Sequence, residues 1–239
     1  MALKQPQSMP PVLTIDGPSG AGKGAVSAAV ARRLGWNALD SGAVYRSVAL
    51  AALERGVSPD DERALVDLTH NVHLTFRAGG DGIAVFLEDR EVGDSLRGED
   101  VSVMASRVAV MPAVRTALLA LQRAYRASPG LVADGRDMGT IVFPDAELKV
   151  FLEASVEERA KRRYKQLKEK GESVILSRLF RDMQARDRRD RERSVAPTVP
   201  APDAVVVDST RMSLDQVIER VVGLAREHFG DWIPKDENQ

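Results

Sequence analysis

A glycine-rich segment that follows an apolar run restricts the possible folds of this chain more than any other feature. It reads "GPSGAGKGA" from Gly17 to Ala25 and precedes an amphipathic segment. Gly17, Gly22 and Lys23 match the pattern G-x-x-x-x-G-K, which is typical of a loop that wraps around phosphate groups. Backbone N–H groups and a helix N-terminus would face the anion, and Lys23 would reach its outer phosphates. The alternative is a strand-to-helix turn that binds no ligand.

Five short apolar runs predict buried strands, and four of them end in aspartate. They cover residues 12–16, 36–40, 130–134, 147–154 and 203–208. Segments with helical periodicity lie between them, at 22–34, 43–55, 114–126, 155–170 and 213–229. This alternation predicts a doubly wound α/β fold with a parallel sheet. Ligands of such a fold bind at the carboxyl ends of the strands.

Two segments interrupt the alternation. Residues 72–97 alternate polar and apolar side chains around two turns, which predicts a small antiparallel unit. Residues 159–193 are helical, densely charged and short of core residues. We therefore expect one domain over 12–230, with an insert at about 60–112 and a lid at about 159–193. Flexible tails are expected at 1–11 and 231–239.

The composition argues against several classes of protein. Lys and Arg total 34 against 35 Asp and Glu, so the chain lacks the basic field of a general nucleic-acid binder. The absence of cysteine excludes disulfides, thiolate nucleophiles and Cys-based zinc sites. A metal site at His70 and His73 would need further ligands nearby, so these histidines and His228 are expected to be ordinary surface or packing residues, and no metal site held by the protein is expected. Neither a signal peptide nor a run of about 20 apolar residues occurs. We expect a cytoplasmic monomer that binds neither nucleic acid nor membranes.

The end of the glycine-rich segment departs from the phosphate-loop pattern. A hydroxyl after the lysine supplies a magnesium ligand in many such loops, and neither Gly24 nor Ala25 has one. Magnesium would then be held by phosphates and water, or by another group. The apolar run that ends in Asp134 has the form of a Walker B strand, whose acid engages the magnesium shell.

Charged residues follow two of the predicted strands. "DSGAVYR" places Ser41 and Arg46 at the start of a helix, where an arginine can bind a phosphate with two hydrogen bonds. A helix cap beside a solvated arginine is the alternative. "LVADGRDMGT" places Arg136 and Asp137 after Asp134. This cation and carboxylate suit the phosphate and the base or sugar of an acceptor, although a turn with a structural ion pair would give the same pattern.

An arginine-rich run occupies residues 178–193, with seven arginines and several acids. Arg186, Asp190 and Arg193 fall at i, i+4 and i+7, which places them on one face of a helix. Two arginines oriented by an aspartate would make a clamp for phosphates in transfer. A solvated face is the usual alternative, and the mixed signs argue against RNA binding.

The motifs "TIDGPSGAGKG", "LDSGAVYR", "ADGRDMGT", "RDRRDRERSVAP" and "VVVDST" occur in this order, and together they resemble the bacterial cytidylate kinases. These are a branch of the P-loop nucleoside monophosphate kinases, and the resemblance covers nearly the whole chain. It implies a P-loop NTPase fold with a five-stranded parallel sheet, an antiparallel insert in the monophosphate-binding region and a helical lid. It further implies transfer of the γ-phosphoryl group of ATP to CMP or dCMP with Mg²⁺, yielding ADP and CDP or dCDP.

The resemblance also implies roles for individual residues. Those implied to bind ATP are Gly17, Pro18, Ser19, Gly20, Ala21, Gly22, Lys23, Gly24 and Ala25. Those implied to bind the monophosphate are Ser41, Arg46, Ser106, Arg115, Asp134, Arg136, Asp137, Arg186 and Asp190. We assign catalysis to Lys23, Arg186 and Arg193, because phosphoryl transfer requires positive charge around the transferred group. Family members commonly carry threonine or serine at the position of Ala25, so weaker magnesium or ATP handling is expected.

Three other functions would share parts of this sequence pattern. A different small P-loop kinase could act on UMP, dTMP or a non-nucleotide alcohol, which a screen of acceptors would separate. A GTPase-like switch would be expected to carry the motif N-K-x-D, which the sequence lacks. An RNA-binding protein that uses the arginine-rich helix would be retained on RNA in a strongly salt-dependent way.

Overall fold

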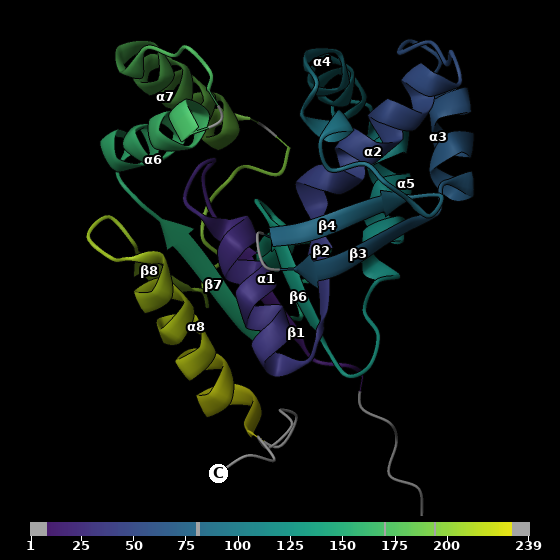
Figure 1. The fold of residues 1–239 in the computed structure, drawn as a ribbon. Helices are drawn as coiled ribbons and strands as arrows, with labels where there is room; N and C mark the ends of the chain where they lie inside the picture. Colours follow the sequence, from purple (N-terminus) through teal and green to yellow (C-terminus); the bar gives the residue numbers. More distant parts are fainter. Residues whose placement is uncertain (1–8, 80–81, 170, 194, 231–239) are drawn as a thin grey trace, which may run out of the picture.

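A five-stranded parallel sheet forms the centre of the protein (Figure 1). The structure is a computed structural model and describes residues 9–79, 82–169, 171–193 and 195–230. The strand order is β2-β6-β1-β7-β8. The strands are β1 (Val12–Asp16), β2 (Asn37–Asp40), β6 (Leu131–Gly135), β7 (Leu148–Glu153) and β8 (Val205–Asp208). The predicted α/β fold with five parallel strands is therefore confirmed.

Two apolar cores cover the two faces of this sheet, because successive residues of a strand point to opposite sides. Leu13 and Ile15 of β1 belong to the core formed with α1 (Lys23–Leu34) and α8 (Leu214–Phe229). Val12 belongs to the opposite core, which includes residues of α2 (Ser41–Glu54), α3 (Glu62–Asn71), α4 (Glu99–Val108) and α5 (Pro112–Arg123). Strands covered on both faces are apolar at nearly every position, which explains the short apolar runs in the sequence.

A separate three-stranded antiparallel sheet forms the predicted insert. Its strands are β3 (Leu74–Gly79), β4 (Gly82–Leu87) and β5 (Arg90–Glu91). The turn between β4 and β5 places Glu88 and Asp89 at φ values of 50° and 65°, as a tight hairpin requires. The first predicted turn of the insert includes residues 80–81, which lie outside the described residues. Both β3 and β4 contact α1, so the insert packs beside the helix that follows the glycine-rich loop.

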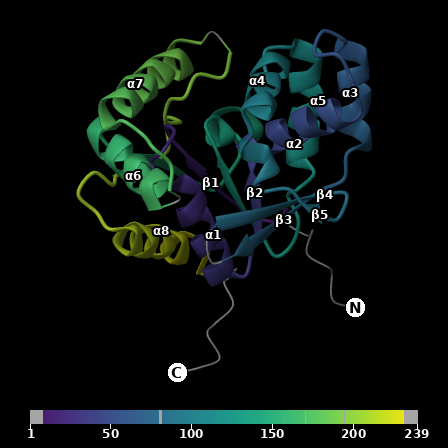
Figure 2. The ribbon, with the colours of Figure 1, turned by 45° about the horizontal axis from the view of Figure 1, so that its top comes forward.

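Two groups of helices stand on either side of the glycine-rich loop (Figure 2). One comprises α2, α3, α4 and α5, with a short helical turn η1 (Ser95–Arg97) before α4. The other comprises α6 (Val156–Glu169) and α7 (Leu176–Glu192), which pack against each other. A short turn η2 (Met138–Val142) follows β6. The helix predicted at 155–170 corresponds to α6, whereas the sequence did not separate α3 and α4 from their surroundings.

The N-terminal boundary differs from the expected one. Residues 1–8 lie outside the described residues, but the carbonyl of Pro10 accepts from Arg126 Nε at 2.6 Å. The carbonyl of Pro11 accepts from the Leu131 amide at 2.9 Å. These bonds attach residues 10–11 to the domain. The expected tail at 231–239 also lies outside the described residues.

Within the described residues no single helix is long and apolar enough to span a membrane. The pair α4 and α5 reaches that length and composition only together, and it is bent by 103° at its break.

Candidate active site

The glycine-rich loop connects β1 to α1 at the carboxyl edge of the sheet. Gly17 has φ 149°, and a Cβ there would lie 2.0 Å from the carbonyl oxygen of Leu152 in β7, so only glycine fits. Gly22, at φ 93°, is the N-cap of α1 and provides no side-chain acceptor to the first turn. The N–H groups of that turn therefore stay available to an anion.

Lys23 begins α1 among carboxylates from neighbouring strands. Its Nζ donates to the carbonyl of Pro18 at 2.9 Å, so the side chain folds back over the loop. Asp40 and Asp134 lie in register on the paired strands β2 and β6. Burial raises the pKa of Asp134 to about 7, while Lys23 lowers it and Asp40 raises it. Burial also lowers the pKa of Lys23, while Asp134 raises it. The loop lysine and the expected Walker B aspartate are thus adjacent.

Asp16 is a buried acid that sequence reasoning did not assign to the site. Its Oδ1 accepts from the Met138 amide at 2.9 Å and its Oδ2 from the Gly139 amide at 2.8 Å. Burial raises the pKa of Asp16 to about 6, although the hydrogen bonds from Gly139 and Met138 lower it. Asp16 therefore anchors the turn after β6, the segment that carries Arg136 and Asp137. The signal in the sequence was that Asp16 ends an apolar run, as Asp134 does.

Arginines from distant segments lie within electrostatic reach of one another. Burial lowers the pKa of Arg186, and the positive charges of Arg136 and Arg46 lower it further, while Asp190 raises it. Burial likewise lowers the pKa of Arg193; Asp137 and Asp190 raise it, and Arg136 and Arg115 lower it. The members of this arginine cluster are Arg46, Arg115, Arg136, Arg186 and Arg193. They come from α2, α5, the end of β6, and α7 with its C-cap.

Two aspartates lie inside the arginine cluster. Arg115 Nη2 lies 3.5 Å from Asp137 Oδ2. Burial raises the pKa of Asp137, and both Arg193 and Arg115 lower it. Asp190 Oδ2 lies 2.9 Å from Arg136 Nε and 3.9 Å from Arg186 Nε. Five cations against two carboxylates leave an excess of positive charge, which suits an anionic ligand.

The remaining predicted binding residues lie as follows. Ser41 is buried at the start of α2, but the cap of that helix is Asp40, whose Oδ1 accepts from the Ala43 amide at 2.9 Å. Ser106 is exposed on α4, and its Oγ donates to the carbonyl of Ser102 in the same helix at 2.9 Å.

The shared helical face expected for Arg186, Asp190 and Arg193 is only partly correct. Arg186 and Asp190 lie on α7, but that helix ends at Glu192. Arg193 is the C-cap, with φ −63° and ψ 136°, and its Nε donates to the carbonyl of Ala196. Arg193 therefore approaches Asp137 from the segment after the helix.

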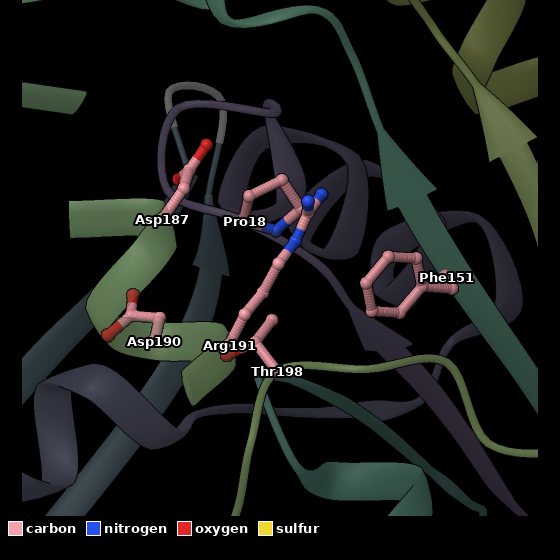
Figure 3. Close-up of a pocket in the computed structure, with 6 residues that line it drawn as sticks. All are labelled: Pro18, Phe151, Asp187, Asp190, Arg191 and Thr198. Carbon is pink, nitrogen blue, oxygen red and sulfur yellow. The ribbon is translucent and has the colours of Figure 1, made fainter. Parts of the chain in front are cut away.

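A small pocket lies where the glycine-rich loop meets α7 (Figure 3). Its lining residues are Pro18, Phe151, Asp187, Asp190, Arg191 and Thr198. Pro18 belongs to the loop, whereas Asp187, Asp190 and Arg191 project from α7. The helix that contributes to the arginine cluster thus lies directly beside the glycine-rich loop.

A family model and curated relatives point to the same family. A family model described as "Cytidylate kinase" matches residues 13–227. The cytidylate kinase of Aeromonas hydrophila is 54% identical over 223 residues, which are 93% of this chain and 97% of the relative. The cytidylate kinase of Methylococcus capsulatus is 56% identical over 219 residues, 91% of this chain and 98% of the relative. That of Pseudomonas aeruginosa is 56% identical over 214 residues, 89% and 93% of the two chains.

Proposed function

This chain belongs to the cytidylate kinase family, and we propose that it transfers the γ-phosphoryl group of ATP to CMP or dCMP, releasing ADP and CDP or dCDP. The observation that supports this most strongly is the arginine cluster, which four segments far apart in the sequence bring together within reach of Asp137 and Asp190. A cluster of this kind suits a nucleoside monophosphate, which has a dianionic phosphate and a polar base.

ATP binds through the loop 17–25 in this proposal. The free N–H groups at the start of α1 cradle the phosphates, and Lys23 exchanges its bond to the Pro18 carbonyl for bonds to the outer phosphates. The strained glycines support this role, because they allow the backbone to turn tightly without side chains between it and the ligand.

The monophosphate binds on the other side of the transferred group. Its phosphate is bound by Arg46, Arg136 and Arg186, and its base and sugar by the carboxylates of Asp137 and Asp190 together with Arg115. The proposed acceptor site also includes Ser41, Ser106 and Asp134. Carboxylates suit an amino group of a base, since an ionised carboxylate only accepts hydrogen bonds.

Mg²⁺ is proposed as the counter-ion of the ATP phosphates. Mg²⁺ dehydrates reluctantly and usually keeps several water and phosphate ligands, so it needs few ligands from the protein. Asp134 is the carboxylate that would engage its shell. A Cβ on Gly24 would sit 3.4 Å from Asp134 Oδ2, which shows that Asp134 lies beside the loop. Bound Mg²⁺ would neutralise part of the phosphate charge.

Phosphoryl transfer requires in-line placement and positive charge around the transferred group more than a general base. Lys23 provides that charge from the loop, and Arg186 and Arg193 provide it from α7 and its C-cap. Arginines that stabilise the transition state raise kcat by roughly 10³- to 10⁵-fold. Segment 159–193 acts as a lid that excludes water, the competing acceptor.

A coupled assay of ADP release tests this function. Purified protein receives ATP and Mg²⁺ with CMP, dCMP, UMP or dTMP, and a reaction without acceptor serves as control. We expect CMP and dCMP to drive ADP formation well above the control. ADP formation only with UMP or dTMP would assign a different acceptor, and none with any acceptor would disprove the kinase assignment.

A further inference from the structure

Arg159 on α6 is a buried arginine, with only 2% of its side chain exposed. Its guanidinium binds both carboxylate oxygens of Asp187 on α7: Nη1 donates to Oδ1 at 3.1 Å, and Nη2 donates to Oδ2. Asp187 is also buried, with 8% of the residue exposed. Two parallel hydrogen bonds of this kind fix direction as well as distance. The pair therefore holds α6 and α7 in one relative position.

The same guanidinium also contacts the phosphate-binding loop. Arg159 Nη1 donates to the carbonyl of Ser19 at 2.9 Å, and Nε donates to the carbonyl of Ala154 at 2.9 Å. Gly20, the next loop residue, lies against both lid helices. A Cβ there would be 2.5 Å from Met183 Cε on α7 and 3.5 Å from Arg159 Cβ on α6. One side chain thus connects the loop, the end of β7 and α7.

Asp187 lies next to the α7 residues that belong to the proposed site. Arg186 precedes it, and Asp190 follows three residues later, so Asp190 lies near the same face of the helix. Figure 3 shows Asp187 and Asp190 on α7 together with Pro18 of the loop. Asp190 in turn lies 2.9 Å from Arg136 at the end of β6. A rotation or shift of α7 around Asp187 would displace Arg186 and Asp190 together.

We propose that Arg159 and Asp187 form a positioning pair that sets α7 against the phosphate-binding loop, so that the arginines of α7 meet the phosphates held by that loop. The pair touches neither reacting group and acts through Arg186 and Asp190. This inference rests on the proposed kinase function. A displacement of about 1 Å at such a site can cost about 100-fold in rate, so accurate placement of α7 matters.

If Arg159 and Asp187 had a purely structural role, the enzyme would respond differently when both are replaced by apolar residues. Buried ion pairs contribute little net stability, and apolar side chains of similar volume often replace them without loss. The double variant Arg159→Met/Asp187→Leu therefore retains the fold but loses the directional contacts to Ser19 and α7. If the pair only stabilises the protein, this variant keeps both its melting temperature and its activity.

The experiment compares the double variant with the wild-type enzyme in the ADP-release assay and in thermal unfolding. We expect a melting temperature within a few degrees of wild type, a fall in kcat of about 10- to 100-fold, and a KM for ATP changed less than about threefold. A kcat equal to that of wild type would overturn the proposal. Wild-type enzyme without CMP-dependent activity would instead contradict the proposed function itself.

Two further variants keep the test decisive if the double variant does not fold. Asp187→Asn retains the shape and one acceptor oxygen but removes the charge, and it should lower kcat more than it raises KM for ATP. Lys165→Met is the matched control, because Lys165 lies on the same helix α6 but pairs with an exposed partner, Glu169, at 3.9 Å. It should leave both constants unchanged. Equal kinetics of Asp187→Asn and Lys165→Met would also overturn the proposal.

Discussion

Arg136 Nε lies 2.9 Å from Asp190 Oδ2, yet among the described residues neither of these buried atoms has a hydrogen-bond partner. The N–H is not directed at the oxygen, so the two side chains attract by charge alone. Both atoms consequently keep their hydrogen-bonding capacity for a ligand. The pair also joins the end of β6 to α7, the two elements between which we propose that the monophosphate binds.

Replacement of Arg136 tests the proposed acceptor site. Arg136→Ala should lower kcat/KM for CMP by about 100-fold, because it removes charge-assisted hydrogen bonds worth about 1.5–3 kcal/mol. ATP binding, measured by calorimetry without CMP, should stay nearly unchanged. Arg181→Ala is the control, since Arg181 is an exposed arginine of α7 outside the arginine cluster. Equal loss of ATP binding and CMP use would contradict the assigned role.

The hydroxyl missing from the loop gives a second prediction. Residue 25 is the third residue of α1 and is only partly buried. Ala25→Thr should reduce the Mg²⁺ concentration for half-maximal rate, because its hydroxyl adds an oxygen ligand. Ala25→Val has the same shape without the hydroxyl and should leave it unchanged. Identical magnesium dependence in all three proteins would mean that water and phosphate already suffice.

Replacing a glycine in the loop and a glycine in a helix should change the stability of the protein in opposite directions. Gly17→Ala should destabilise the protein by more than about 3 kcal/mol, because its Cβ would meet the Leu152 carbonyl at 2.0 Å. Gly223 lies within α8, and a Cβ there meets nothing within 4 Å. Gly223→Ala should therefore stabilise it by about 0.5–1 kcal/mol. Urea unfolding measures both, and tolerance of Gly17→Ala would show that the loop can relax.

The buried acid Asp16 should make stability depend on pH. Its pKa of about 6 in the folded protein exceeds the ordinary value of 3.8. Between these values the folded state holds more protons than the unfolded state, so stability falls as pH rises from about 4 to above 6. The shift corresponds to roughly 3 kcal/mol.

The measurement is the free energy of unfolding of ligand-free protein between pH 4 and 8. Asp16→Asn cannot ionise, so its stability should fall less than that of wild type as pH rises. Burial and the charge of Asp16 both raise the pKa of Asp134, so the difference between the two proteins reports the ionisation of Asp16 together with its effect on Asp134. Parallel pH profiles would show that Asp16 titrates normally in the folded state.

Much of the fold could be predicted because its signals are local. A strand buried on both faces needs apolar residues along its length, and a loop around phosphates needs glycines followed by a lysine. These requirements lie within a few residues of one another, as in segment 12–25. The hairpin after β4 was likewise visible in its turn at 88–90. Boundaries were less accurate: α2 begins at Ser41 because Asp40 caps it, two residues before the predicted start.

The sequence by itself determined the parallel sheet, the glycine-rich loop and the types of residue at the proposed site. Only the tertiary structure decided which of these residues meet. Arg159 and Asp187 are 28 residues apart in a segment full of charges, and no local pattern distinguishes this pair from the exposed ones. Arg193 does not lie on the helical face that its spacing predicted, because α7 ends one residue earlier, at Glu192. Burial and pairing of a charge depend on which helices pack together, and that is set by long-range contacts.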